Sequence, residues 1–417
     1  MLEILAPVVF VVALLLIATD WLHRTAVVFA GASLFVLTGV LDQHDAFDAI
    51  DLDTLGLLVG MMIIVTITER TGIFEQVAIT AMRISRGRPA AVVALLVSFT
   101  AVLSAFLDNL TSILLVAPIT IIVASRFGMP PAPLLIMQII ASNLGGTATL
   151  VGDPPNIMIA GATGLSFNAF LLNLAPISIA SLVVVCGSLF LLRRREFRGH
   201  GRPVIIDDIQ PDVALASGRD LWLPVGIMTA TILAFFVHGP LGVEPATVAL
   251  AGATAMLLTD AAPLDDTLGR IDWATLLFFG GLFVMVGGLE HVGFIDAVAR
   301  TTQHITAGSR PGELFGILGI SAIGSAFVDN IPFTAAMIPV VEQLNEGNDA
   351  SYWWALSLGA CYGGNATIIA AAANVACQGI AERHGVRITF RQFLGWGIPA
   401  TMLSLAIAAL FLAVIQL

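Results

Sequence analysis

The sequence has no lysine, three cysteines and few charged residues, and each shortage excludes a class of protein. Charged residues are 11% of the 417 residues, whereas soluble domains carry about 25%. The cysteines Cys186, Cys361 and Cys377 lie in apolar surroundings without metal-site spacing, so neither a disulfide framework nor a zinc centre is predicted. All eighteen basic residues are arginines, and the net charge of −11 argues against a nucleic-acid partner.

Apolar residues dominate instead, in stretches long enough to cross a membrane. Hydrophobic residues are 58% of the chain, and the mean hydropathy is +0.95. A spanning helix needs about 20 apolar residues, and such stretches recur from end to end. The first, Leu5 to Ala18, lacks a basic flank and a cleavage site, which indicates a retained helix rather than a signal peptide. The chain is therefore predicted to be an all-α integral membrane protein.

The two halves of the chain repeat each other with an offset of 221 residues. The segment SAFLDN at 104–109 aligns without a gap with SAFVDN at 325–330. After three residues are dropped from the second copy, GGTAT at 145–149 aligns with GGNAT at 363–367. A duplicated apolar chain with an Asp-Asn pair in each copy is typical of a secondary transporter built from two repeats.

Each copy contains two interrupted apolar regions. Re-entrant hairpins with two short arms are predicted at residues 90–125 and 312–342, and broken helices at 132–163 and 352–380. Glycine and proline break helices, and in a membrane broken backbone survives only where it lines a protein or water cavity. The interruptions should therefore meet around a central site.

The number of crossings predicts an inverted repeat. If the hairpins do not cross, the copies 1–195 and 221–417 each cross five times, and an odd number turns the second copy upside down. Placing the linker 196–220 in the cytoplasm puts sixteen arginines inside and only Arg300 and Arg310 outside, as the positive-inside rule requires. We expect about ten spans in the bacterial cytoplasmic membrane, with both termini outside.

Asp108 and Asp329 are the strongest candidates for chemistry. An ionisable group at membrane depth is costly and is functional by default, although each Asp could also cap the helix that follows it. Burial favours the protonated carboxyl group, so either residue could exchange a proton. The neighbouring Asn109 and Asn330 offer a small ligand both a donor and an acceptor.

Other polar residues at the interruptions complete the predicted pocket. They are Thr111, Ser112, Asn143, Thr147, Thr149 and Asn156 in the first copy, and Cys361, Asn365, Thr367 and Asn374 in the second. Asp153 is a third acid, matched by alanine in the second copy, and is either a proton-coupling group or a turn residue of Gly-Asp-Pro-Pro. Cys361 could touch a soft ligand such as trivalent arsenic, or could simply be a small core residue.

These motifs resemble a known family. The residues 108–112 with Pro118, the segment SNLGGTAT at 142–149 and the segment VGDPPN at 151–156 are similar to the ion transporter superfamily, in particular to arsenical pump membrane proteins and P-protein permeases. The resemblance covers nearly the whole chain. It implies two re-entrant hairpins and two broken helices around a central site, and efflux of arsenite and antimonite driven by the proton gradient. It also implies, for some members, a cytoplasmic arsenite-stimulated ATPase as partner, and a homodimer.

The sequence thus predicts a transporter and not an enzyme. No nucleotide-binding loop is found, so transport should use an ion gradient or a partner ATPase, without a cofactor. Arsenite is mostly neutral at pH 7 and suits a pocket of Asn, Thr and Ser groups. Arg24, Arg70 and Arg126 are expected at span ends and not in the pocket, which ranks a dicarboxylate-type anion transporter lower. A sodium/proton antiporter is the second hypothesis.

Overall fold

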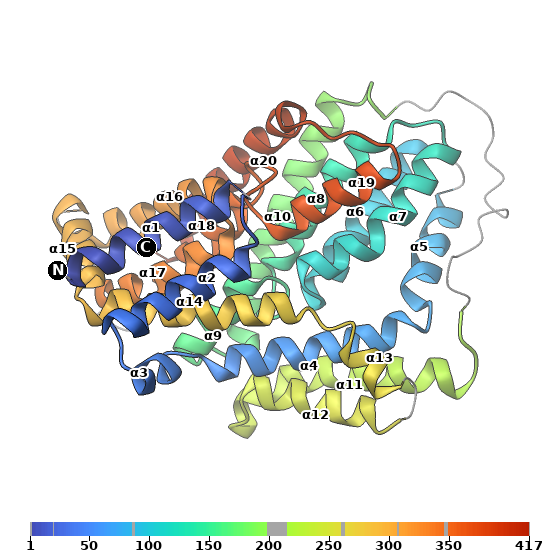
Figure 1. Ribbon diagram of the computed structural model, residues 1–417. Helices are drawn as coiled ribbons and strands as arrows, with labels where there is room; N and C mark the ends of the chain where they lie inside the picture. The colour runs from blue at the N-terminus through green and yellow to red at the C-terminus, as the bar shows by residue number, and fades with distance from the viewer. Residues whose placement is uncertain are drawn as a thin grey trace.

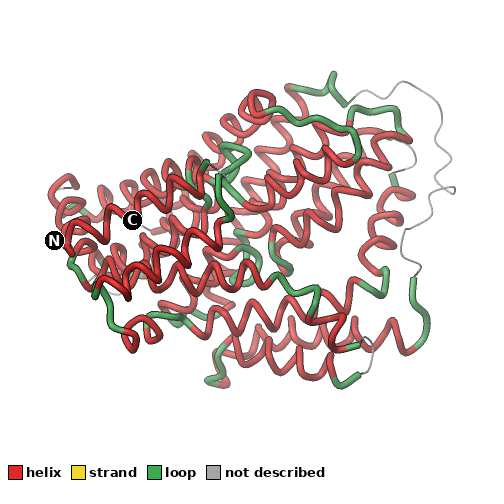
Figure 2. The backbone as a smooth tube through the Cα atoms, in the orientation of Figure 1, coloured by secondary structure: helices red, strands yellow, loops and turns green. Residues whose placement is uncertain are grey.

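The computed structural model describes residues 2–19, 21–85, 88–197, 215–259, 263–306, 308–345 and 349–416, which form helices joined by short loops (Figure 2). Most of the predicted linker, 198–214, lies outside the described residues. The first repeat contains α1 (Leu2–Ala18), α2 (Arg24–Thr38), α3 (Gln43–Asp48), α4 (Leu52–Glu69), α5 (Ile73–Ile84), α6 (Pro89–Phe106), α7 (Asn109–Arg126), α8 (Pro131–Gly146), α9 (Pro154–Thr163) and α10 (Phe167–Leu192).

The second repeat has the same order of elements. It contains α11 (Arg219–Leu241), α12 (Pro245–Leu257), α13 (Leu264–Leu268), α14 (Trp273–His291), α15 (Phe294–Thr306), α16 (Arg310–Phe327), α17 (Asn330–Leu344), α18 (Ala350–Gly363), α19 (Ala372–Arg383) and α20 (Phe390–Phe411), which ends in a π-helical turn, Leu412–Gln416. The predicted all-helical membrane fold, with a hairpin and a broken helix in each repeat, is confirmed.

Seven of the described helices are long and apolar enough to cross a membrane: α4, α6, α7, α10, α11, α14 and α20 with its extension. The hairpin arms are longer than the short arms that we expected. The arms α6, α7 and α16 have 18 residues each, a length of about 27 Å. The arms are long because the interruption takes only Leu107 and Asp108, with Asp108 capping α7 directly.

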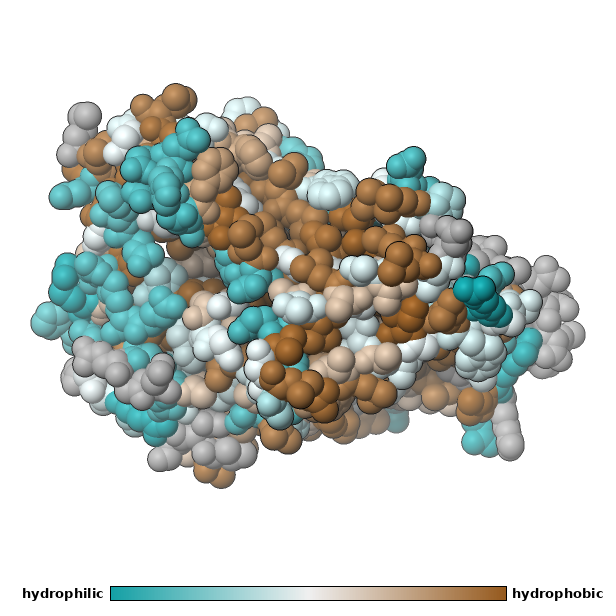
Figure 3. Space-filling view, turned by 90° about the horizontal axis from the view of Figure 1, so that it is seen from below, coloured by the Kyte–Doolittle hydropathy of each residue, from teal (hydrophilic) through white to brown (hydrophobic). Residues whose placement is uncertain are grey.

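Two amphipathic helices, α5 and α15, were not predicted from the sequence. They are repeat mates, and each connects a span to the hairpin that follows it. Figure 1 shows α15 at the end of the molecule where both termini lie and α5 at the opposite end, as an inverted repeat requires. In the space-filling view a broad apolar band crosses the middle, and hydrophilic residues gather at both ends (Figure 3).

Close helix packing positions the hairpins. The arm α6 packs on α8, and α16 packs on α18, while α7 contacts α19 and α17 contacts α9 of the opposite repeat. Gly145 and its mate Gly363 lie against the backbones of Ala101 and Ala322, where a methyl group would collide. A separate frame is formed by α2 with α14 and by α4 with α12, the latter through Gly60 against Ala249. Each hairpin is thus locked to a broken helix beside this frame.

Candidate functional site

The two interruptions in each repeat bring four helix N-termini to the centre of the molecule. They are those of α7 at Asn109, α17 at Asn330, α9 at Pro154 and α19 at Ala372. Matched hydrogen bonds tie each broken helix to its own hairpin: Thr149 donates to the carbonyl of Ala105, and Thr367 to that of Ala326. Backbone N–H groups at helix N-termini favour negative charge.

Asp153 lies at the middle of this arrangement and contacts both hairpins. Its Oδ1 atom accepts hydrogen bonds from Nδ2 of Asn109 and Nδ2 of Asn330, both at 3.2 Å. No described residue donates a hydrogen bond to Oδ2, and the thiol of Cys361 is a neighbour of the carboxyl group. The carboxyl group is fully buried. Asp153 therefore links the two hairpins as well as forming the Gly-Asp-Pro-Pro turn.

The predicted amides fall into two groups. Asn143 belongs to the central cluster, because it accepts from Asn109 at 3.3 Å and donates to Oδ1 of Asn365 at 3.1 Å and of Asn374 at 3.2 Å. Asn156 and Asn374 instead donate to carbonyl groups of the broken segments, those of Thr147 and Thr149 in the first repeat and of Gly364 and Thr367 in the second. Their amide groups thus satisfy the backbone of the breaks.

The hydroxyl groups predicted for substrate are mostly engaged as well. Thr147 donates to the carbonyl of Asn143 at 2.7 Å, while Thr149 and Thr367 tie the breaks to the hairpins. Thr111 binds the Asp108 carboxylate. Ser112 is buried, and its Oγ has no hydrogen-bond partner among the described residues.

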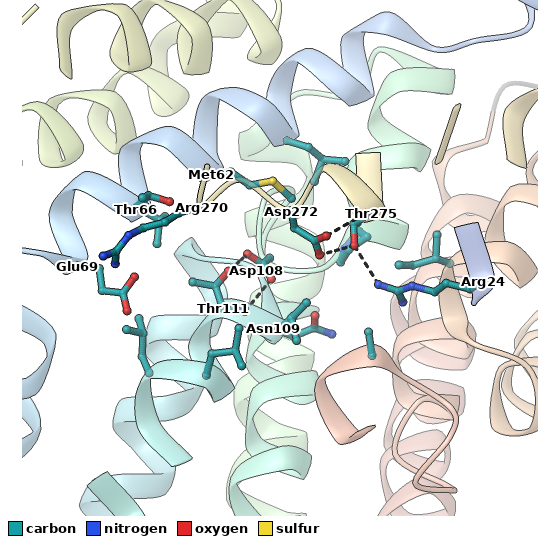
Figure 4. A pocket seen from close by; sticks show the side chains of 18 residues that line it. Arg24, Met62, Thr66, Glu69, Asp108, Asn109, Thr111, Arg270, Asp272 and Thr275 are labelled. Carbon is teal, nitrogen blue, oxygen red and sulfur yellow. Dashed lines mark hydrogen bonds between the residues drawn. The ribbon is translucent and has the colours of Figure 1, made fainter. Parts of the chain in front are cut away.

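A cavity of about 180 Å³ opens beside the first hairpin. Its lining includes Asp108, Asn109 and Thr111 of the hairpin tip and the starts of α9, α17 and α19 at Pro154, Ile331 and Ala372. Figure 4 shows Arg24 at one side of the cavity, Arg270 and Glu69 at the other, and Asp108 and Asp272 between them. The expectation that no arginine lies in the pocket was therefore wrong for Arg24, and Arg270 joins it there.

Arg24 reaches the cavity because α2 packs along α14. Its Nη2 donates to Oγ of Thr275 at 2.9 Å, and its guanidinium group lies 5.3 Å from the ring centre of Phe278. Its Nη1 lies 3.7 Å from Oδ2 of Asp329 at the tip of the second hairpin. Arg24 thus joins the frame to a hairpin and to the predicted proton carrier of the second repeat.

Sequence reasoning missed five polar residues of this cavity: Arg24, Thr66, Arg270, Asp272 and Thr275. Glu69, at the end of α4, lines the cavity too. The one available signal was the pair Asp272 and Thr275, whose repeat mates are Asp51 and Thr54. Both pairs form the same helix cap, in which the Asp carboxylate accepts from the Thr three residues later.

Comparison with known proteins supports a transporter. An uncharacterized transporter of Mycobacterium bovis is 40% identical over 425 residues, covering 98% of each chain. The human P protein is 31% identical over 489 residues; the match covers 96% of this chain and 58% of that protein. The crystal structure of the Alcanivorax borkumensis YdaH transporter, described as having an unusual topology, matches 99% of this chain and 98% of that one with a TM-score of 0.62 at 16% identity, a likeness of fold.

The P-protein resemblance expected from the motifs is confirmed, and so is the expectation of a transporter rather than an enzyme. A family model also matches most of the chain. It covers residues 14–359 and is described as citrate transporter, CitMHS. The chain therefore belongs to the CitMHS family of membrane transporters.

Proposed function

We propose that the protein is a secondary active transporter that moves a small carboxylate anion together with protons. The observation that carries this proposal is the pair Arg24 and Arg270 on opposite sides of the cavity at the hairpin tips. Guanidinium groups bind carboxylates with paired, charge-assisted hydrogen bonds. The helix N-termini on the cavity lining favour an anion too, and the family description names citrate.

Coupling to protons follows from the charges of the same cavity. Asp108, Asp272 and Glu69 also line it, so the two arginines face three carboxyl groups. An entering anion would be repelled unless one or more of these groups, or the nearby Asp329, were protonated. Anion and protons would therefore bind together.

Proton-driven efflux of arsenite and antimonite is the second candidate function. The contact of Cys361 with Asp153 favours it, because a thiol beside buried amides would suit a neutral, soft arsenic compound. Against it, Thr147, Thr149 and Thr367 donate their hydroxyl groups to backbone carbonyls. Sodium/proton antiport would use the same carboxyl groups. It is distinguished from carboxylate transport and from arsenite efflux by which added solute causes proton flux.

The test uses purified protein in proteoliposomes loaded with a pH-sensitive dye. Citrate, smaller dicarboxylates, arsenite, antimonite and sodium would be added separately across an imposed proton gradient. We expect proton flux with a carboxylate and its loss in Arg270→Gln. Arg126→Gln, at the exposed end of α7, is the matched control. Flux with arsenite or antimonite and none with any carboxylate would select the second candidate, and flux with sodium alone would contradict both.

The predicted orientation adds a direction to the proposal. Glu69 and Arg270 lie beside α5 and α13, at the end of the molecule opposite the termini. With the linker in the cytoplasm of a bacterial cell and both termini outside, this cavity would face the cytoplasm. Cysteine labelling from either side of the membrane, at Ser217 for the linker end and at Leu2 for the N-terminal end, would test that placement.

A further inference from the structure

The two hairpin carboxylates are repeat mates, but they are stabilised in different ways. Oδ1 of Asp108 accepts from the backbone N–H of Thr111 at 2.9 Å, and Oδ2 accepts from the hydroxyl of the same residue. The first repeat therefore satisfies both oxygens of Asp108 from one residue of its own hairpin. No ion pair of Asp108 is found among the described residues.

The second hairpin cannot form that cap, because Pro332 stands where the first has Thr111. Proline has neither a backbone N–H nor a hydroxyl group to donate. Oδ1 of Asp329 accepts from the backbone of Ile331 at 3.0 Å, and Oδ2 faces Nη1 of Arg24 at 3.7 Å. Asp329 is 8% exposed, so Arg24 is its main source of compensation for burial of the charge.

Arg24, in turn, does not depend on Asp329 for its position. Thr275 and the ring of Phe278 hold the guanidinium group from α14, and its side chain remains 25% exposed. The first repeat alone supplies this arginine, since its mate in the second repeat is Pro245. A carboxylate entering the cavity could therefore bind Arg24 in place of Asp329, with the arginine already in position.

We propose that Arg24 exchanges partners: it pairs with Asp329 when no substrate is bound, and it pairs with the substrate's carboxylate when substrate enters. Asp329, left buried without a cation, then takes a proton from water onto a carboxylate oxygen. The other charged groups that line the cavity or lie at the helix breaks near Asp329 are Asp108, Asp153, Asp272 and, across the cavity beside Glu69, Arg270. The charged residues within the helices packed against the second hairpin tip lie toward the helix ends away from it: Glu290 and His291 of α14, Arg310 and Glu313 of α16, and Glu342 of α17. The nearby acids cannot compensate the Asp329 charge, and Arg270 lies on the other side of the cavity, so none of these groups replaces Arg24. This exchange rests on the proposed function and names Asp329, not Asp108, as the group that couples anion to proton.

The first test needs no substrate. Infrared difference spectra of the purified protein in nanodiscs are recorded against pH, and the Asp329 carboxyl band is identified by its loss in Asp329→Asn. In Arg24→Gln that band should persist to a pH higher by about one to three units, the usual effect of removing an adjacent opposite charge. Arg70→Gln is the control, because Arg70 pairs with Asp266 and not with Asp329. It should leave the pH at which the Asp329 band disappears unchanged. An unchanged band in Arg24→Gln overturns the proposal.

Pro332→Thr is the matched variant that adds hydrogen-bond donors to the second hairpin. It gives Asp329 the two donors that Thr111 gives Asp108, so the shift caused by Arg24→Gln should shrink in this background. If the shift keeps its full size although Pro332→Thr is folded and its hydroxyl binds Asp329, the exchange argument fails, because Asp329 would not depend on its local donors as described.

The second test adds citrate to weakly buffered protein and measures binding by calorimetry and proton uptake with a pH indicator. We expect uptake of about one proton per citrate in the wild type and in Asp108→Asn, and binding without uptake in Asp329→Asn. Citrate binding without uptake in the wild type, or uptake lost only in Asp108→Asn, would overturn the exchange. Absence of citrate binding would overturn the proposed function instead, and the infrared result would still decide the ion pair.

Discussion

Replacement of Asp153 should separate its role as a link between hairpins from its role as a charge. Asp153→Ala removes the acceptor of two side-chain hydrogen bonds, one from each hairpin. Asn109 keeps a second partner in Asn143, whereas the side-chain N–H groups of Asn330 have no other described acceptor. Asp153→Asn keeps a carbonyl oxygen in the same place and removes only the charge.

The expected magnitudes follow from these contacts. A hydrogen bond to a charged group contributes about 1.5–3 kcal/mol, and the two N···O distances of 3.2 Å favour the lower end. Asp153→Ala should therefore lower the free energy of unfolding by about 3 kcal/mol. Asp153→Asn should be as stable as the wild type or more stable, because a buried carboxylate without a cation costs free energy.

Thermal unfolding in detergent, followed by loss of monodisperse protein in size-exclusion chromatography, measures the difference. If the Ala and Asn variants unfold at the same temperature, Asp153 does not hold the hairpins together and the reasoning is refuted. Transport by the stable Asn variant then tests the charge. Loss of uphill transport with retained downhill exchange assigns a proton-coupling role, and full uphill transport makes Asp153 a structural turn residue.

The remaining predictions concern packing, coupling, accessibility and pH. Gly145→Ala should destabilise the protein by about 1–3 kcal/mol or more, because the added methyl group meets the backbone of Ala101. The control Gly226→Ala in α11 adds a methyl group in open space and should leave the unfolding temperature unchanged. Equal unfolding temperatures of the two variants would contradict the prediction. Asp329→Asn should abolish uphill transport and leave the protein folded, and proton-driven accumulation that persists in proteoliposomes of this variant would contradict the prediction. Cys361 is fully buried, so a variant with this cysteine alone should resist maleimide until it is denatured, and rapid labelling of the folded protein would contradict the sealed cluster. Burial raises the pKa of the Asp349 carboxyl group, but hydrogen bonds from Ser351 and the charge of Arg310 outweigh it and keep this pKa below the usual value. Asp349 should therefore stabilise the fold at pH values above its unfolded pKa, and this stabilisation should vanish as pH falls through its lowered folded pKa. The unfolding temperatures of the wild type and Asp349→Asn should accordingly differ near neutral pH and become equal in acid.

Much of the fold could be predicted because its signals are local. The repeat, the Asp-Asn pairs and the glycine and proline breaks are visible in the sequence, and they mark where helices must stop. The helices α5 and α15 were missed because they are amphipathic and short, and a search for apolar spans passes over them.

The site was predicted less completely, because a polar residue at a helix break has two possible uses. Asn156 and Asn374 look like ligands in the sequence, but a broken helix leaves carbonyl groups that need donors, and these amides supply them. Arg24 looks like a span end in the sequence, and only the packing of α2 against α14 shows that it reaches Thr275 and Asp329. Whether Arg24 lies at the surface or at the cavity depends on the packing of α2 against α14 of the other repeat. No local sequence pattern contains that contact.

The differences between the repeats indicate how a nearly symmetric fold can bind a substrate with unequal affinity on its two sides, while the gradients set the direction of net transport. The frame and both hairpins are duplicated, but Thr111 corresponds to Pro332, Arg24 to Pro245 and Asp153 to Ala371 in the alignment of the two repeats. Each difference changes the charge or the donors available to a hairpin carboxylate. If the repeats exchanged conformations during transport, the inverted state would place its cavity beside a hairpin of different electrostatics, without an arginine in the position of Arg24. An anion held by Arg24 in the present cavity would be bound more weakly in that one, and release would follow from sequence differences at three positions rather than from a change of fold.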